Sequence, residues 1–151
     1  MSSTDLRTTP RAAFPHFCEI ATRWMDNDVY GHVNNVVYYS YFDTAVNHFL
    51  IERGVLDIHK GEVVGFVVDS GCSYFKPIAF PDTVHAGIRV ARLGNSSVRY
   101  EIGIYRNEDA APAAVGHFVH VYVERSSNRS VAIPAPVRHV LETIRGAVTT
   151  N

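Results

Sequence analysis

Cysteine, long apolar runs and basic clusters are all scarce in this chain of 151 residues. The two cysteines, Cys18 and Cys72, stand alone, with no CxxC pair and no cysteine–histidine spacing typical of a metal site. A reduced, cytoplasmic protein is the simplest interpretation. No apolar run approaches the roughly 20 residues of a membrane-spanning helix, so we expect no membrane partner. The net charge of −1, without a basic run, gives no electrostatic footprint for a nucleic-acid partner.

The composition is that of a folded protein with a core. Hydrophobic residues make up 46% of the chain, and the length is ordinary for one domain. Residues 1–15 are polar and lack the apolar centre of a signal peptide, so we expect a flexible leader there. The sequence therefore predicts a single domain over residues 16–147, followed by a frayed C-terminal tail.

The most apolar segment of the chain predicts a long helix from about Asn35 to Arg53. Gly54 is well placed just after the helix, where the backbone often turns left-handed. Apolar residues cover most of the helix circumference, which favours a buried helix over one laid on a surface. These residues are Val36, Val37, Tyr38, Tyr39, Tyr41, Phe42, Ala45, Val46, Phe49 and Leu50.

The remainder of the chain predicts β-strands. Apolar and polar residues alternate over 82–94 and 96–107, as in strands with one buried face, and LGNSS between them predicts a hairpin. Further strands are expected at 16–26, 63–78 and 113–125, and a short helix at about 137–146. The order indicates an α+β fold in which a long antiparallel sheet curls around the buried helix.

A polar decapeptide, DNDVYGHVNN at residues 26–35, stands directly before the predicted helix. Two interpretations are open. Asp, Asn and Gly favour turns, and Asn34 or Asn35 is a good N-cap, so the segment is explained as a turn with a helix cap. In the other interpretation it is a reaction centre. The unpaired N–H groups of the helix end stabilise an oxyanion there, and Asp26 or Asp28 acts as base or nucleophile.

The segment RWMDNDVYGHVNNVVYYSYFDTA resembles the N-terminal signature of the hotdog-fold thioesterases of the 4-hydroxybenzoyl-CoA thioesterase family. A weaker likeness continues through YFKPIAFPDTV and RLGNSSVRYEI. The resemblance implies a hotdog fold, with the antiparallel sheet wrapped around a long central helix. It also implies that Asp28, the second acid of Asp-x-Asp, is catalytic, and that the backbone N–H near Asn35 polarises the thioester carbonyl.

The same resemblance implies further site residues. His32 and Asn34 match the His-Val-Asn-Asn form of the motif, and Tyr38 is one of its spaced tyrosines. We expect these three side chains to shape the substrate site. Asp43 matches an acidic helix position that is catalytic in some branches, but the Asp-x-Asp sequence favours Asp28. We interpret Asp43 as a helix acid bonded to nearby groups.

A CoA substrate needs cations and hydrogen-bond donors for its phosphates. The family often meets the nucleotide near the hairpin RLGNSS, so the resemblance implies CoA contacts at Arg92, Asn95, Ser96 and Ser97. Other arginines that offer a cation are Arg125, Arg129 and Arg138.

The resemblance therefore predicts an acyl-CoA thioesterase that releases a free acid and CoA. It implies no metal and no redox cofactor, and a homodimer or homotetramer with its sites at the subunit interface. Two other functions stay open: a non-catalytic acyl-CoA binding module on the same fold, and a thioesterase that acts on acyl carrier protein. Binding without turnover is typical of the first, and a basic patch beside the acyl channel is typical of the second.

Overall fold

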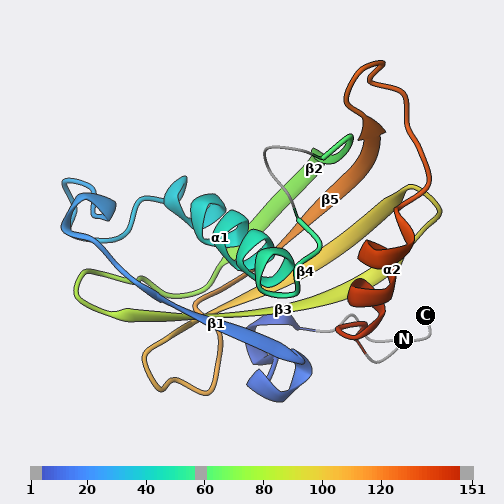
Figure 1. Ribbon diagram of the computed structural model, residues 1–151. Coiled ribbons are helices and arrows are strands. Elements are labelled where there is room, and N and C mark those ends of the chain that lie inside the picture. Colours follow the sequence, from blue (N-terminus) through green and yellow to red (C-terminus); the bar gives the residue numbers. More distant parts are fainter. Residues whose placement is uncertain (1–4, 57–60, 147–151) are drawn as a thin grey trace.

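A five-stranded antiparallel sheet and one long helix form the body of the molecule (Figure 1). The computed structural model describes residues 5–56 and 61–146. The strand order is β1-β3-β4-β5-β2, so β1 and β2 are the two edges of the sheet. The strands are β1 His16–Ala21, β2 Val63–Tyr74, β3 Thr83–Leu93, β4 Ser97–Arg106 and β5 Ala114–Glu124. The α+β class with an antiparallel sheet is confirmed.

Helix α1, Val37–Glu52, packs against one face of the twisted sheet (Figure 1). Its buried side chains are Tyr38, Tyr41, Phe42, Ala45, Val46, Phe49 and Leu50, which confirms the predicted burial. Removing a large apolar side chain from water contributes about 1.5–3 kcal/mol, so this face holds the helix in place. Gly54 has a φ of 74° and its N–H donates to the Ile51 carbonyl, as expected of the residue that ends a helix.

The first predicted strand, 16–26, is wrong over its second half. Strand β1 ends at Ala21, and Trp24–Asp26 forms a 3-10 turn instead. The Asp26 carboxylate accepts hydrogen bonds from both the backbone N–H and the guanidinium of Arg23. A short-range acceptor of this kind competes with strand pairing and bends the chain.

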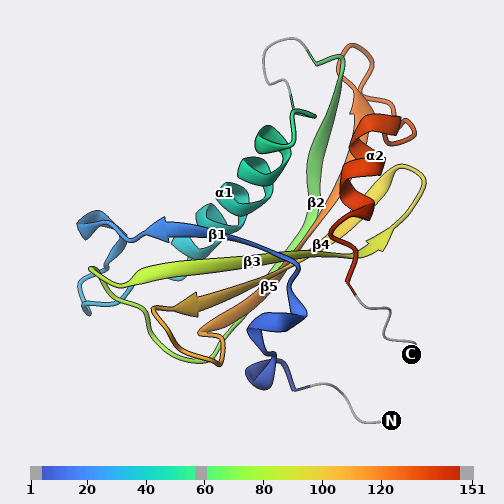
Figure 2. The same ribbon diagram turned by 60° about the horizontal axis from the view of Figure 1, so that its bottom comes forward.

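The C-terminal helix α2, Ala135–Glu142, begins and ends earlier than the predicted 137–146. Pro136 lies in its first turn, where a missing N–H costs no intrahelical hydrogen bond. After the helix the chain joins β3, because the N–H of Val90 donates to the Ile144 carbonyl at 2.9 Å. Figure 2 shows α2 beside the end of β5 and the hairpin that leads into β4. In the described part of the chain, no helix combines the length and apolarity needed to cross a bilayer.

Residues 5–15, for which the sequence suggested a flexible leader, lie against the sheet face opposite α1 (Figure 2). Leu6–Thr8 and Arg11–Ala13 form short 3-10 helices, and Phe14 is only 4% exposed. Phe14 fits there because Gly103 has no side chain: a Cβ on that glycine would lie 2.5 Å from the ring. The expected frayed tail at 147–151 lies outside the described residues.

Candidate active site

The decapeptide 26–35 folds into a compact loop at the N-terminal end of α1. The Asp28 N–H donates to the His32 carbonyl at 2.9 Å, and the Asn34 N–H donates to the Asp26 carbonyl at 2.9 Å. Gly31 turns the chain with a φ of 83°, a conformation that favours glycine. The turn interpretation is therefore confirmed: the segment is a tight loop that presents polar groups beside a helix end.

Asp26 is the buried anchor of this loop. Its side chain is 1% exposed and forms an ion pair with Arg23 at 2.8 Å, while the Tyr41 hydroxyl donates to its other oxygen at 2.9 Å. Burial by itself raises the pKa of the Asp26 carboxyl, but the hydrogen bonds from Arg23 and Tyr41 outweigh it and hold the pKa below the ordinary value. Asp26 is thus ionised, fully paired and turned away from solvent.

Asp28, two residues further on, is in a different state. One carboxylate oxygen accepts from the Tyr30 N–H at 2.8 Å, and no donor in the described residues reaches the second oxygen. The side chain lines an open depression with Trp24, Met25 and Val29, which are 75%, 73% and 93% exposed. Asp28 therefore offers a carboxylate oxygen at a surface where large apolar side chains gather.

The start of α1 leaves one backbone donor available. The helix begins at Val37, two residues later than predicted, and just before it the Asn34 side chain accepts from the Val36 N–H at 3.1 Å. The Asn35 carbonyl accepts from the Tyr74 hydroxyl at 3.1 Å, but no described residue accepts from the Asn35 N–H. An unpaired N–H at the positive end of a helix is suited to stabilising an anionic oxygen.

The other predicted site residues of this region have distinct surroundings. Tyr38 is 3% exposed and packs edge-on against Tyr74, with ring centroids 5.0 Å apart. Burial raises the pKa of the Tyr38 hydroxyl to about 12, so it stays protonated. His32 is exposed, and its ring has no partner in the described residues. Asp43 is also exposed, and the Asn47 side chain donates to its backbone carbonyl. Its carboxylate has no hydrogen-bond or ion-pair partner in the described residues, so the expected bonds of this acid to nearby groups are not found.

Sequence reasoning missed Tyr74 and Tyr41 as supports of the site. Tyr74 lies on β2 and reaches Asn35 across 39 residues of chain, a contact without any local sequence signal. Tyr41 did carry a signal, since it follows Tyr38 by three positions and therefore shares its helix face. The Tyr41 hydroxyl donates to Asp26, and only the fold of the loop brings that carboxylate within reach.

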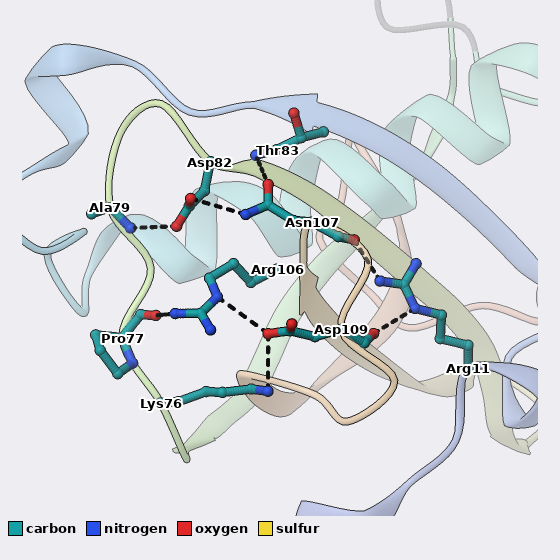
Figure 3. A network of polar contacts seen from close by, with 9 residues as sticks. All are labelled: Arg11, Lys76, Pro77, Ala79, Asp82, Thr83, Arg106, Asn107 and Asp109. Atoms are coloured by element: carbon teal, nitrogen blue, oxygen red, sulfur yellow. Dashed lines mark hydrogen bonds and ion pairs between the residues drawn. The ribbon is translucent and has the colours of Figure 1, made fainter.

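The connection between β2 and β3 holds the decapeptide in place. The Val33 N–H donates to the Ile78 carbonyl at 2.7 Å, and the Phe80 N–H donates to the Asn27 side chain at 3.1 Å. This connection is in turn fastened to the segment that joins β4 and β5, by the polar network of Figure 3. The decapeptide is therefore supported by two layers of hydrogen bonds.

Asp109 is the centre of that network. Its carboxylate forms ion pairs with Lys76 at 3.0 Å and with Arg106 at 3.2 Å (Figure 3). These two cations, Lys76 first, hold the pKa of the Asp109 carboxyl below its ordinary value. Arg106 also donates to the Pro77 carbonyl, and the Asn107 side chain donates to Asp82 at 3.0 Å. None of these charged side chains lines the depression that contains Asp28.

The hairpin expected to bind CoA lies at the other end of β3 from this loop. The Thr22 N–H, near the loop, donates to the carbonyl of Asp82, the residue just before β3. The hairpin instead follows Leu93, the last residue of β3. Arg92 is exposed, while the carbonyls of Asn95 and Ser96 accept from Ile133 and Tyr122 N–H groups. Within one chain, Arg92, Asn95, Ser96 and Ser97 are not brought together with Asp28 and Asn35.

A sheet curved over one long helix, with a polar loop at the helix start, defines the hotdog fold, and comparisons with known proteins agree. The PA5185 protein of Pseudomonas aeruginosa is 55% identical, over 93% of this chain and 98% of that one, with a TM-score of 0.90. A Thermus thermophilus thioesterase, complexed with coenzyme A and Zn, is 32% identical over 86% and 94% of the two chains, with a TM-score of 0.72. The YsmA protein of Bacillus subtilis is 21% identical over 81% of this chain and 82% of its own.

The family follows from the match of residues 22–141 to the model of the Thioesterase-like superfamily. The chain belongs to that superfamily. The matched range begins before the decapeptide and ends within α2, so it includes every site residue predicted above.

Proposed function

We propose that this protein is an acyl-CoA thioesterase of the 4-hydroxybenzoyl-CoA thioesterase family. The observation that carries the proposal lies on one loop. There, among residues 5–56 and 61–146, an Asp28 carboxylate oxygen has no donor and the Asn35 backbone N–H has no acceptor. Membership of the Thioesterase-like superfamily supports a thioester as the substrate. A relative that binds coenzyme A supports CoA as the thiol.

The reaction is a hydrolysis with two routes. In the first, the Asp28 carboxylate takes a proton from water as the water oxygen bonds to the thioester carbon. The carbonyl oxygen becomes an oxyanion that the Asn35 N–H stabilises; the C–S bond then breaks and the CoA thiolate takes up a proton. In the second, an Asp28 oxygen bonds to the carbon as the C–S bond breaks and CoA leaves as the thiolate, which takes up a proton; water then hydrolyses the anhydride to the free acid and the Asp28 carboxylate. His32, Asn34 and Tyr38 shape the pocket in either route.

A homodimer formed through the edge strand β2 is part of this proposal. Phe66, Val67 and Val68 on β2 are 48%, 48% and 59% exposed. Strand β2 has twelve residues and lies at an edge of the sheet, so one of its sides pairs with no other strand of the described residues. Long apolar edges are normally covered, because they otherwise pair with another chain. A second copy of β2 covers this edge and brings a second subunit close to Tyr74 and Asn35. A tetramer is the larger assembly that the family resemblance suggests.

The distant hairpin fits the same assembly. Since Arg92, Asn95, Ser96 and Ser97 lie away from Asp28 in one chain, their proposed contacts with CoA require the hairpin of a neighbouring subunit. Mixed oligomers test this: Asp28→Asn and Arg92→Ala subunits, each impaired alone, recover part of the activity when combined. Absence of recovery, with both variants impaired and mixing verified by mass spectrometry, contradicts the composite site.

The activity itself is tested with a panel of short, long and aromatic acyl-CoA substrates, with free thiol release as the readout. We expect turnover that depends on the acyl group. Saturable binding without thiol release favours the non-catalytic acyl-CoA module and overturns the enzyme proposal. Turnover of acyl carrier protein thioesters only, with CoA thioesters inert, favours the third function.

A further inference from the structure

Three side chains able to bind a metal ion meet at the C-terminal end of α1, far from the proposed active site. His16 comes from β1, and His48 and Glu52 come from α1. Their ligand atoms all lie within 4.8 Å of one another, and His16 Nε2 is 4.0 Å from a Glu52 oxygen. His48 and Glu52 follow the first helical residue, Val37, by 11 and 15 positions, so a rise of 1.5 Å each puts the cluster roughly 17–23 Å from the helix start.

The cluster combines a helix spacing with a fold contact. His48 and Glu52 are four residues apart, so both project from the same face of α1. His16 is on the edge strand β1, which pairs with β3 only. Neither element holds three ligands alone, and the absence of a metal motif in the sequence follows from this division.

One ligand atom of the cluster, Nε2 of His16, is buried and lacks a hydrogen-bond partner among the described residues. The ring itself is fixed edge-on against Phe49, with centroids 4.9 Å apart. Burial lowers the pKa of the imidazole, an effect that Glu52 opposes and Arg53 and His48 reinforce. The Glu52 oxygen, at 4.0 Å from Nε2, is beyond hydrogen-bond distance and leaves this nitrogen available to a metal ion.

We propose that His16, His48 and Glu52 form a zinc site that ties the edge strand β1 to α1. Zinc bonds of about 2.0–2.2 Å place tetrahedral ligand atoms roughly 3.4 Å apart. The 4.0 Å between His16 and Glu52 therefore has to close by well under 1 Å. Both helix side chains are exposed and free to rotate, and water completes the coordination.

The charge around the site sets a moderate affinity. The Glu52 carboxylate attracts a cation, whereas the Arg53 guanidinium, stacked at 4.8 Å on Phe49, repels it. The site is structural rather than catalytic, because its ligands lie at the opposite end of α1 from Asp28. Thioester turnover in metal-stripped protein is therefore expected to match that of the zinc-loaded protein at temperatures where both are folded.

The test is calorimetric titration of zinc chloride into metal-stripped protein, with His48→Gln and Glu52→Gln as variants. Both residues are exposed on the helix, so neither change threatens folding. His139→Gln, an exposed histidine in the last turn of α2, is the matched control. We expect one zinc per chain and at least tenfold weaker binding in both variants, because even outer partners of metal ligands are worth about 10–100-fold.

Two further readouts identify the third ligand, His16, without mutating it. Zinc is expected to shift the imidazole ¹⁵N resonance of His16, and to raise the melting temperature of the wild type and His139→Gln but not of His48→Gln or Glu52→Gln. The proposal is overturned if no stoichiometric binding occurs, if both helix variants bind like the wild type, or if binding leaves the His16 resonance unchanged.

Discussion

Unpaired polar groups at the two ends of α1 have opposite surroundings. At the N-terminal end, Asp28 keeps one oxygen without a donor and Asn35 keeps an N–H without an acceptor, among the described residues. At the C-terminal end, a cavity of about 550 Å³ is lined largely by apolar side chains such as Leu50, and His120 is 6% exposed. The first end holds unpaired polar groups at the surface, whereas the second holds two buried nitrogens, His16 Nε2 and His120 Nε2, without a partner in the described residues.

The difference shows how unpaired groups are kept in position. A buried polar group without a partner costs free energy. Unpaired groups are therefore better kept at the surface, where bonded neighbouring residues hold them in position. Asp26 does this at the N-terminal end, where Arg23 and Tyr41 satisfy its carboxylate. No comparable anchor is bonded to His120, whose Nε2 has no partner in the described residues. The N-terminal end therefore presents its unpaired groups at the surface beside a bonded anchor, whereas the C-terminal end keeps unpaired imidazole nitrogens in the interior.

The largest expected effect separates the two acids that compete for the catalytic role. Asp28→Asn is expected to lower kcat/KM for acyl-CoA by about 100-fold or more, because the base or nucleophile is lost. Asp43→Asn is the matched control, since Asp43 is also a solvent-accessible acid but lies inside the helix. Thiol release measures both. Retention of activity in Asp28→Asn together with its loss in Asp43→Asn moves the catalytic role to the helix.

The second prediction separates the neighbouring acids by stability. Asp26→Asn is expected to lower the free energy of unfolding by about 3 kcal/mol, because Arg23 loses its buried carboxylate partner. Asp28→Asn, at a half-exposed position, is expected to change it by less than about 0.5 kcal/mol. Urea unfolding followed by circular dichroism measures both. Equal losses in the two variants contradict the assignment of Asp26 as the anchor.

The contribution of Asp26 to stability is expected to decrease at acid pH. Its pKa is lowered in the folded state, so the native protein binds fewer protons than the unfolded chain. The stabilisation from Asp26 is complete above the ordinary pKa of 3.8 and is lost as the pH falls through the lower folded value. Asp26→Asn is therefore expected to lose less stability than the wild type when the pH is taken below about 4.

Much of this arrangement followed from local sequence signals. The apolar circumference of 36–50 predicted a buried helix, Gly54 predicted its end, and alternation predicted β3 and β4, since each signal reports on adjacent residues. The 3-10 turn at Trp24–Asp26 was missed because its cause is one side chain bonding back to Arg23. The contacts of Tyr74 with Asn35 and of His16 with Glu52 join distant segments, and no residue pattern encodes them.

The third prediction concerns the buried histidine at the C-terminal end. Burial lowers the pKa of His120 to about 4, so below its ordinary value of 6.5 the unfolded chain binds a proton that the folded protein does not. Stability is therefore lost as the pH falls, by about 2 kcal/mol between pH 7 and pH 5. His120→Phe removes the titrating group.

Urea unfolding at several pH values compares wild type and His120→Phe. The variant is expected to keep a flatter profile over this range, since the remaining groups titrate alike in both proteins. Its stability at pH 7 is expected to change little, because an unpaired buried nitrogen is replaced by an apolar ring. Parallel profiles in the two proteins contradict the buried, uncharged state of His120.

The smallest expected effects come from two glycines, one at each end of α1. Gly31 and Gly54 have φ values of 83° and 74°, and a Cβ at either position meets nothing within 4 Å. Alanine at each is therefore expected to cost about 1 kcal/mol of stability from backbone strain alone. Only Gly31 lies in the loop that carries Asp28, so only Gly31→Ala is expected to lower kcat/KM, by a few-fold. Equal activity losses in Gly31→Ala and Gly54→Ala mean that α1 transmits strain along its length, and the two ends are then not independent.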